Sequence, residues 1–212
     1  MNDRRFAIYY APDEEGPLSR AASAWWSSDK WRNATESPRG YGFHATLKPP
    51  FRLAAGADEP QLTREFERFA AAKRPFVAPR LQLASLGDFI ALVLSEFSRE
   101  FADLADAAVQ EFDRFRAAPS PLELERRRKA TLNPRQLELL ERWGYPYVFE
   151  EWRFHMTLTG PLEAVPRRKL QTLLRTRFEP HCRNPFRVDS ICLFEQPEAD
   201  APFRCRMRLP LR

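Results

Sequence analysis

The chain has 212 residues, of which 43% are hydrophobic and 30% charged, with 19 prolines and 7 glycines. These totals exclude a disordered or low-complexity protein and are typical of a globular chain, here of a length that fits one compact unit with two lobes. The formal net charge of +5 favours an anionic partner such as phosphate or nucleic acid, or simply aids solubility.

The N-terminal segment and the cysteines exclude further classes. The first residues, MNDRRFAIYY, carry charges where a signal peptide needs an apolar segment, and no stretch reaches the length of a membrane span. We therefore expect a cytoplasmic protein without a membrane partner. The three cysteines lack CxxC spacing, and the chain contains no glycine-rich phosphate loop and no dinucleotide fingerprint. We expect neither a metal site nor a cofactor.

The first half of the chain alternates between strand and helix patterns. In chain order we predict a strand over 4–10, a helix from Pro17, a strand over 43–53, a helix over 58–75, and strands over 76–86 and 89–97. Alternation in the first strand sets Arg5 and Tyr9 on one face, which lines a cleft or faces solvent. Gly87 and Asp88 are the turn signal between the last two strands.

The second half repeats this order after a helical connector. We predict helices over 98–115 and 133–144, a strand in the segment 153–162, a helix over 165–180, and strands over 186–194 and 203–211. Strand, helix, strand and strand therefore occur twice, which indicates an internal duplication. Within the connector the charged run ERRRKA (125–130) is more typical of a solvated surface than of a nucleic-acid site.

Two short phrases carry the strongest signal of the repeat. GFHATLKPPF spans 42–51 and RFHMTLTGPL spans 153–162, so two of the three histidines occupy matching positions. Side chains alternate along a strand, so each phrase has one apolar face and one polar face. The predicted polar faces consist of His44, Thr46 and Lys48 in the first copy, and Arg153, His155, Thr157 and Thr159 in the second.

Two histidines beside one phosphate suit the cleavage of a phosphodiester. A neutral imidazole can accept the proton of the attacking oxygen while an imidazolium protonates the leaving oxygen, because the ordinary pKa of histidine, about 6.5, lies near the working pH. Thr46 and Thr157 can donate to the non-bridging phosphate oxygens, and Lys48 can add positive charge. A single His-x-Thr in a strand is usually a half-buried histidine beside a strand former, but two matching copies favour a catalytic pair.

The paired phrases FHATL and FHMTL resemble the two H-x-T/S-x motifs of the 2H phosphoesterase superfamily. More narrowly, YGFHATLKPPF together with FHMTLTGPL resembles the phosphonate metabolism protein family encoded in phosphonate-utilisation operons. The resemblance implies an α+β fold that is bilobed and pseudo-twofold, with two antiparallel sheets lining a central cleft and helices on the outer faces. It implies a metal-independent cyclic phosphodiesterase with His44 and His155 in proton transfer, Thr46 and Thr157 as phosphate ligands, and Tyr41 and Lys48 as substrate contacts.

The predicted organisation is a single bilobed domain over 1–212, with lobe 1 at about 1–97, the connector at about 98–150 and lobe 2 at about 151–212. We expect a small phosphorylated substrate, such as a ribosyl cyclic phosphate of phosphonate catabolism, with Arg153 and Thr159 as further contacts. RNA is the less favoured partner. The alternatives are a 2′,3′-cyclic phosphodiesterase acting on RNA ends and a catalytically silent module that binds a phosphorylated ligand.

One strand leaves a question of orientation open. In FRCRMRL the alternation sets Arg204, Arg206 and Arg208 on one face. These guanidinium groups either grip a second phosphate from a sheet that lines the cleft, or lie in solvent at a sheet edge, which is the interpretation we favour slightly.

Overall fold

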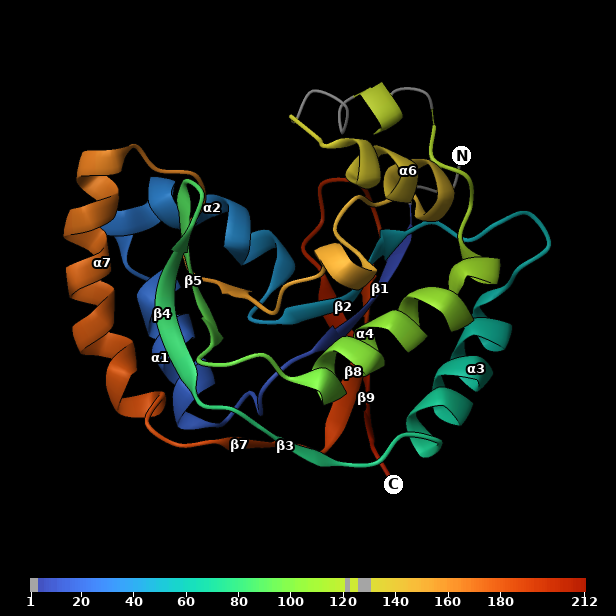
Figure 1. Ribbon diagram of the computed structural model, residues 1–212, viewed down its shortest axis with the longest axis horizontal. Coiled ribbons are helices and arrows are strands. Elements are labelled where there is room, and N and C mark those ends of the chain that lie inside the picture. Colours follow the sequence, from blue (N-terminus) through green and yellow to red (C-terminus); the bar gives the residue numbers. More distant parts are fainter. Residues whose placement is uncertain (1–3, 121–122, 126–130) are drawn as a thin grey trace.

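The computed structural model describes residues 4–120, 123–125 and 131–212 (Figure 1). Its strands are β1 (Arg5–Tyr10), β2 (Ala45–Phe51), β3 (Phe76–Ala78), β4 (Leu81–Leu86), β5 (Phe89–Leu94), β6 (Met156–Thr157), β7 (Phe186–Val188), β8 (Ser190–Gln196) and β9 (Arg204–Pro210). Its α-helices are α1 (Pro17–Trp26), α2 (Arg32–Tyr41), α3 (Glu59–Ala71), α4 (Arg99–Glu111), α6 (Pro134–Trp143) and α7 (Ala164–Phe178). Short 3-10 turns are η1 (Asp29–Trp31), η2 (Asp113–Phe115), η3 (Phe149–Glu151) and η4 (Glu179–His181).

The strands of the described residues form an antiparallel seven-stranded sheet in the order β4-β5-β6-β2-β1-β8-β9, and a separate pair of β3 with β7. The large sheet has two parts, β4-β5-β6 and β2-β1-β8-β9. In the described part of the chain these two parts are joined by one residue pair, Ala45 opposite Met156. The two predicted sheets are thus continuous through their motif strands, within the predicted α+β fold.

The pseudo-twofold relation is visible in which residues pair. Met156 follows Ala45 by 111 residues, the same separation as between the two motif histidines, so each of these residues faces its own counterpart in the repeat. In the smaller sheet Val77 pairs with Arg187, 110 residues later. A residue can pair with its own counterpart across antiparallel strands only near a twofold axis, so the duplication predicted from the sequence is present in space.

The two repeats are interleaved. The β4-β5 hairpin comes from the first half of the chain, yet it pairs with β6 from the second half, and β8 pairs with β1. Each part of the large sheet therefore combines strands from both of the chain lobes predicted over 1–97 and 151–212.

Local signals in the sequence explain where the helices begin and end. Asp58 caps α3 and Asn133 caps α6, each in a capping box that satisfies backbone N–H groups of the first turn. Pro17 stands at the start of α1, where a missing N–H costs nothing. Gly144, with φ of 72°, ends α6 in the left-handed conformation that glycine adopts readily.

Helices α1, α3, α4 and α7 and the main hydrophobic core lie on one face of the large sheet. Residues such as Trp25 of α1, Phe66 of α3, Phe101 of α4 and Leu174 of α7 pack with the apolar side chains of the sheet. Helices α1 and α7 cover the part with β4 and β5, and α3 and α4 cover the other part (Figure 1). A smaller apolar cluster that includes Tyr9 lies on the opposite face. No helix in the described ranges is long and apolar enough to cross a membrane.

Candidate active site

The two histidine phrases lie on neighbouring antiparallel strands. Continued by one residue in each direction, the β2-β6 register sets His44 opposite Thr157 and Thr46 opposite His155. All four side chains therefore share one face of the sheet, the face away from the main core. His44 and His155 are diagonal neighbours, which lie about 7–8 Å apart, with their Cβ atoms somewhat closer. Two imidazoles at this spacing can reach the same phosphate group.

Each imidazole is oriented by the same backbone contact. Nδ1 of His44 donates to the carbonyl oxygen of Gly42 at 3.0 Å, and Nδ1 of His155 donates to that of Arg153 at 2.8 Å. A carbonyl oxygen can only accept, so Nδ1 carries the proton in the neutral ring of both residues. Nε2 then remains available for proton transfer, and in His44 it lies 3.3 Å from the hydroxyl of Thr46.

The ring of His44 is enclosed by aromatic side chains. Tyr9 stacks on it with ring centroids 3.7 Å apart and planes 18° apart, and Phe194 lies tilted at 6.3 Å. Burial, together with the neighbouring charge of His155, lowers the pKa of His44 to about 4. His44 is therefore neutral over most of the pH range in which the protein would work.

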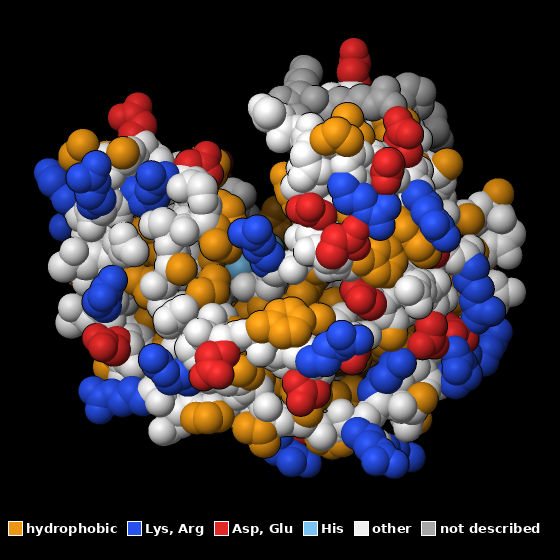
Figure 2. Space-filling view, viewed as in Figure 1, with side chains coloured by type: hydrophobic (Ala, Val, Ile, Leu, Met, Phe, Trp, Pro, Cys, Tyr) orange, Lys and Arg blue, Asp and Glu red, His pale blue; other side chains and the backbone are white. Residues whose placement is uncertain are grey.

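His155 lies in the wall of a cavity of about 500 Å³ that also contains Thr46. The rest of this wall comes from the β4-β5 turn, from α6 and from the segment after α6, and includes Phe89, Tyr145, Tyr147, Trp152 and Arg153. The space-filling view shows a hollow between two raised parts of the surface, with histidine atoms visible at its base (Figure 2). Burial lowers the pKa of His155 as well.

Tryptophans fix the backbone of the two motif strands. Trp152 Nε1 donates to the carbonyl oxygen of Thr46 at 2.8 Å, which ties the second phrase to the first. Trp25 and Trp26 both donate to the carbonyl oxygen of Leu158, at 2.9 and 3.3 Å. The indole N–H groups of largely buried rings need acceptors. Here these hydrogen bonds hold the backbone of the motif strands in place.

Two of the predicted substrate contacts lie beside the motif histidines. Arg153 is exposed and lines the cavity next to His155. Tyr41 is exposed over 40% of its surface, and its ring stacks on Phe203 with centroids 5.4 Å apart. Of the two, only Arg153 is among the residues that line the hollow.

The prediction that Lys48 shares the face of His44 is wrong. Lys48 pairs with Ile8 while Thr46 pairs with Tyr9, so β2 contains an extra residue at this point, and the bulge turns Lys48 toward α4. Its side chain is 1% exposed and Nζ donates to the carbonyl oxygen of Val109 at 3.0 Å. Lys48 therefore contacts the core and not the hollow.

Thr159 is also placed differently from the prediction. It is fully buried, and its hydroxyl oxygen accepts from the backbone N–H of Ile90 at 3.0 Å. The backbone N–H groups of Leu158 and Thr159 both donate to the carbonyl oxygen of Ile90, so the alternation of β6 ends directly after Thr157. Thr159 attaches the end of β6 to β5 and does not reach a substrate.

The predicted arginine face of the last strand is split. A bulge in the β8-β9 pairing turns Arg206 and Arg208 to opposite faces. Arg206 forms ion pairs with Glu59 and Glu195, whereas Arg208 donates to the backbone of Ala11 at 2.7 Å. β9 is an edge strand, as we favoured, but Arg206 and Arg208 bind protein groups where we expected them to lie in solvent.

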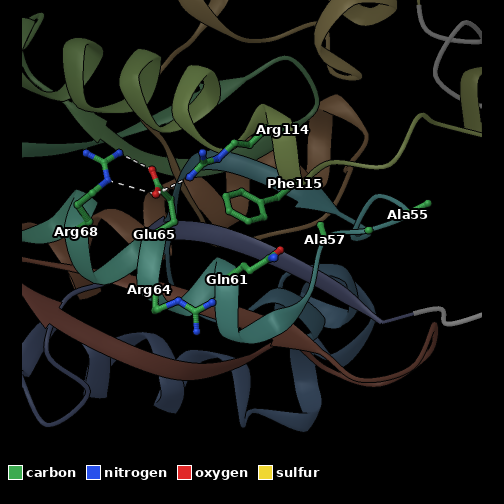
Figure 3. Close-up of a pocket in the computed structure, with 9 residues that line it drawn as sticks. Ala55, Ala57, Gln61, Arg64, Glu65, Arg68, Arg114 and Phe115 are labelled. Atoms are coloured by element: carbon green, nitrogen blue, oxygen red, sulfur yellow. Dashed lines mark hydrogen bonds and ion pairs between the residues drawn. The ribbon is translucent and has the colours of Figure 1, made fainter.

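A second hollow, of about 580 Å³, lies between α3 and η2 (Figure 3). Its most conspicuous charges are already paired, because Arg68 and Arg114 both bind the buried carboxylate of Glu65. The hydrogen bond from Arg68 holds the pKa of Glu65 below its ordinary value. The residues that line this hollow include neither histidine nor cysteine, and the ion pairs attach α3 to η2.

Several residues of the site were not singled out as functional from the sequence. Phe89, Tyr145, Tyr147 and Trp152 carry no motif, because their role depends on which loops meet at the hollow. For Tyr9 the sequence did give one indication, because the alternation in 4–10 placed its side chain on the face opposite the core. The sequence could not show that β1 lies beside β2 with Tyr9 opposite Thr46.

The fold is the α+β fold of the 2H phosphoesterases. The crystal structure of E. coli LigT complexed with 3′-AMP matches with a TM-score of 0.52 over 98% of both chains, at 14% sequence identity. At that identity the likeness concerns the fold alone.

The chain belongs to the family described as "Protein of unknown function (DUF1045)", whose model matches residues 46–204. Two curated relatives bear the name "Ribose 1,5-bisphosphate phosphokinase PhnN". The protein of Janthinobacterium sp. (strain Marseille) is 34% identical over 97% of this chain and 50% of its own length. That of Laribacter hongkongensis (strain HLHK9) is 35% identical over 96% of this chain and 51% of its own. The chain thus spans about half the length of these relatives.

Proposed function

We propose that the protein is a metal-independent phosphoesterase that opens a small cyclic phosphodiester, with His44 and His155 as its acid–base pair. The observation that carries the proposal is the matched orientation of the two rings. Each donates from Nδ1 to the carbonyl oxygen two residues before it, and adjacent strands present both on one face. An acid–base pair needs this arrangement, in which Nε2 of each ring, and not Nδ1, is the atom that exchanges a proton with the substrate.

The proposed reaction is hydrolysis with two proton transfers. A neutral imidazole accepts a proton from water as the water oxygen bonds to phosphorus. The imidazolium of the other histidine protonates the ester oxygen as the bond between that oxygen and phosphorus breaks. Thr46 and Thr157 donate to the non-bridging oxygens, where negative charge increases in the transition state. The two histidines exchange protonation states in each turnover and are reset by solvent.

We propose a ribosyl cyclic phosphate as the substrate. In a 5-phosphorylated ribose 1,2-cyclic phosphate, hydrolysis of the bond between phosphorus and oxygen 2 leaves one phosphate on carbon 1 and one on carbon 5. The product is ribose 1,5-bisphosphate. That compound stands in the name of the two curated relatives. The hollow of about 500 Å³ has room for a substrate of this size.

One observation favours a second candidate, the 2′,3′-cyclic phosphate of a nucleoside or of an RNA end. Phe89, Tyr145 and Tyr147 line the hollow beside His155, and aromatic rings suit the stacking of a nucleobase. In this candidate the chemistry at the two histidines is unchanged, and only the group attached to the ribose differs.

The test is a panel of cyclic phosphates assayed with and without excess chelator. It contains ribose 1,2-cyclic phosphate with and without a 5-phosphate, nucleoside 2′,3′-cyclic phosphates and a short RNA with a cyclic end. We expect turnover of the phosphorylated ribose in chelator, and about a 100- to 10,000-fold loss of kcat in His44→Ala or His155→Ala. His181→Ala is the matched control, because His181 is exposed on η4.

Two results would contradict the proposal. Full activity in both alanine variants would exclude the acid–base pair. Tight binding of a cyclic phosphate without product after long incubation would instead identify a binding module.

A further inference from the structure

Tyr9 lies directly beneath His44 in the centre of the large sheet. Strand β1 is paired on both sides, with Thr46 of β2 and Cys192 of β8 opposite Tyr9. The side chain of Tyr9 is 1% exposed. Its ring lies 3.7 Å from that of His44, centroid to centroid, with 18° between the planes. One face of the imidazole is therefore covered by a ring whose backbone is held in the sheet on both sides.

Tyr9 is itself held by the small apolar cluster on this face. Phe194 lies 4.9 Å and Phe203 6.3 Å from it, and Ala7, Ala11 and Cys192 complete the cluster. Such a packed aromatic ring has little freedom to tilt. Two contacts therefore fix the position of the His44 ring: the stacking of Tyr9 on one face, and the hydrogen bond from Nδ1 to the carbonyl oxygen of Gly42.

The second histidine has a different environment, although its motif is the same. In the described ranges no aromatic ring stacks on His155, and Phe89 lies tilted by 57° at 5.9 Å. His155 stands in the cavity wall, whereas His44 rests on the apolar cluster. The two motifs are therefore not equivalent, because an aromatic ring stacks on His44 whereas His155 borders the cavity.

We infer that Tyr9 is a positioning residue, which through the face of its ring fixes His44 as the proton acceptor of the pair and leaves His155 as the proton donor. The inference rests on the proposed function. An imidazole with one face on an apolar surface has fewer water contacts to stabilise its cationic form, so it is suited to begin the reaction neutral. The more open ring can carry the proton that the leaving oxygen receives.

The titratable groups around the pair support this assignment. Tyr41, Tyr145 and Arg5 all lie close enough to Tyr9 to influence its pKa. Burial raises the pKa of Tyr9 well above its ordinary value, so the phenol stays neutral and supplies no charge to His44. Burial, followed by the charge of His155, lowers the pKa of His44 to about 4, so His44 is the ring that stays neutral. The ring of Tyr9, and not its hydroxyl, is therefore the part that matters.

The first test compares Tyr9→Phe with Tyr9→Leu. Tyr9→Phe keeps the stacked ring and should keep kcat within about threefold, whereas Tyr9→Leu should lower kcat roughly 10- to 100-fold with little change in KM, as expected for a misplaced reacting group. Tyr10→Leu is the matched control, because Tyr10 packs on Phe101 and Phe154 on the opposite face of the same strand. Wild-type kcat in Tyr9→Leu, or an equal loss in Tyr10→Leu, would overturn the inference.

The second test needs no substrate and separates this inference from the proposed function. Proton NMR titrations of the histidine rings, assigned with His44→Asn and His155→Asn, should show His44 titrating below His155 in the wild type. In Tyr9→Leu the titration of His44 should move upward, toward about 6.5, as water reaches the exposed face. If Tyr9→Leu does not fold, Tyr9→Met takes its place. A wild-type His155 that titrates below His44 would overturn the inference whatever the activity assays give.

Discussion

His44 and His155 carry the same backbone contact but differ in what covers their rings. In the proposed assignment the productive enzyme has His44 neutral and His155 protonated, so it exists mainly between the pKa of His44 and the pKa of His155. The first lies at about 4, and burial keeps the second below its ordinary value of 6.5. Both limits therefore lie on the acid side of neutrality.

This order of pKa values predicts an acidic optimum for kcat/KM. As the pH rises through about 4, His44 loses its proton and kcat/KM rises; as it rises further through the pKa of His155, the proton donor is lost and kcat/KM falls. We expect the falling limb below pH 6.5 in the free enzyme, measured with the preferred cyclic phosphate in buffers of constant ionic strength. A plateau that extends beyond pH 8 would contradict the assignment.

At the scale of residues the sequence predicted well where the strand period holds and failed where it breaks. His44, Thr46, His155 and Thr157 lie on one face because both phrases stay extended as far as the last of these residues. Lys48 and Thr159 each stand two residues after a motif threonine, and both were predicted to share its face. A bulge in β2 and the end of β6 intervene, and neither follows from residue type.

At the scale of elements, the bulge in β2 moves a lysine into the interior of the protein. Nζ of Lys48 contacts the carbonyl oxygen of Val109 at 3.0 Å and lies 3.7 Å from Asp113. Burial nevertheless dominates and lowers the pKa of Lys48 to about 8 from its ordinary 10.5. The charged form therefore weakens the fold at neutral pH.

Lys48→Met tests this placement through stability. Because the folded pKa is below the unfolded one, the wild type gains stability as the pH rises from about 8 to 10.5, up to about 3 kcal/mol, and Lys48→Met has no such gain. Urea unfolding of both proteins at several pH values measures the difference. The variant should keep kcat/KM within about threefold, since Lys48 lies outside the hollow. A loss of orders of magnitude would show that Lys48 takes part in substrate binding or catalysis.

At the scale of the whole molecule, the duplication could be recognised in the sequence, but the way in which the strands of the two repeats pair could not. The order strand, helix, strand and strand recurs with nearly constant spacing, and the helix caps at Asp58 and Asn133 could be recognised from local signals. Which strand pairs with which depends on contacts between distant residues. Nothing local in β6, two residues long, indicates that it separates β2 from β5. The sequence therefore suggested two consecutive lobes where the strands interleave.

Interleaving predicts that the chain can be divided but that neither part will fold alone. In the chain cut between residues 120 and 131, the first fragment holds β1 to β5 and the second holds β6 to β9. Without β6, the β4-β5 hairpin loses its link to β2, and without β1, the β8-β9 hairpin loses its neighbour. An isolated hairpin is marginal in water, so each fragment should lack a cooperative thermal transition.

An equimolar mixture of the two fragments should recover that transition together with activity. A first fragment carrying His44→Ala, or a second fragment carrying His155→Ala, is the matched control, because it should restore folding without turnover. Calorimetry of each fragment and of the mixtures measures the thermal transition, and the cyclic phosphate assay measures activity on the same samples. If one fragment unfolds cooperatively alone, the sheet does not depend on the β2-β6 pair, and the acid–base site would be formed between two independent lobes.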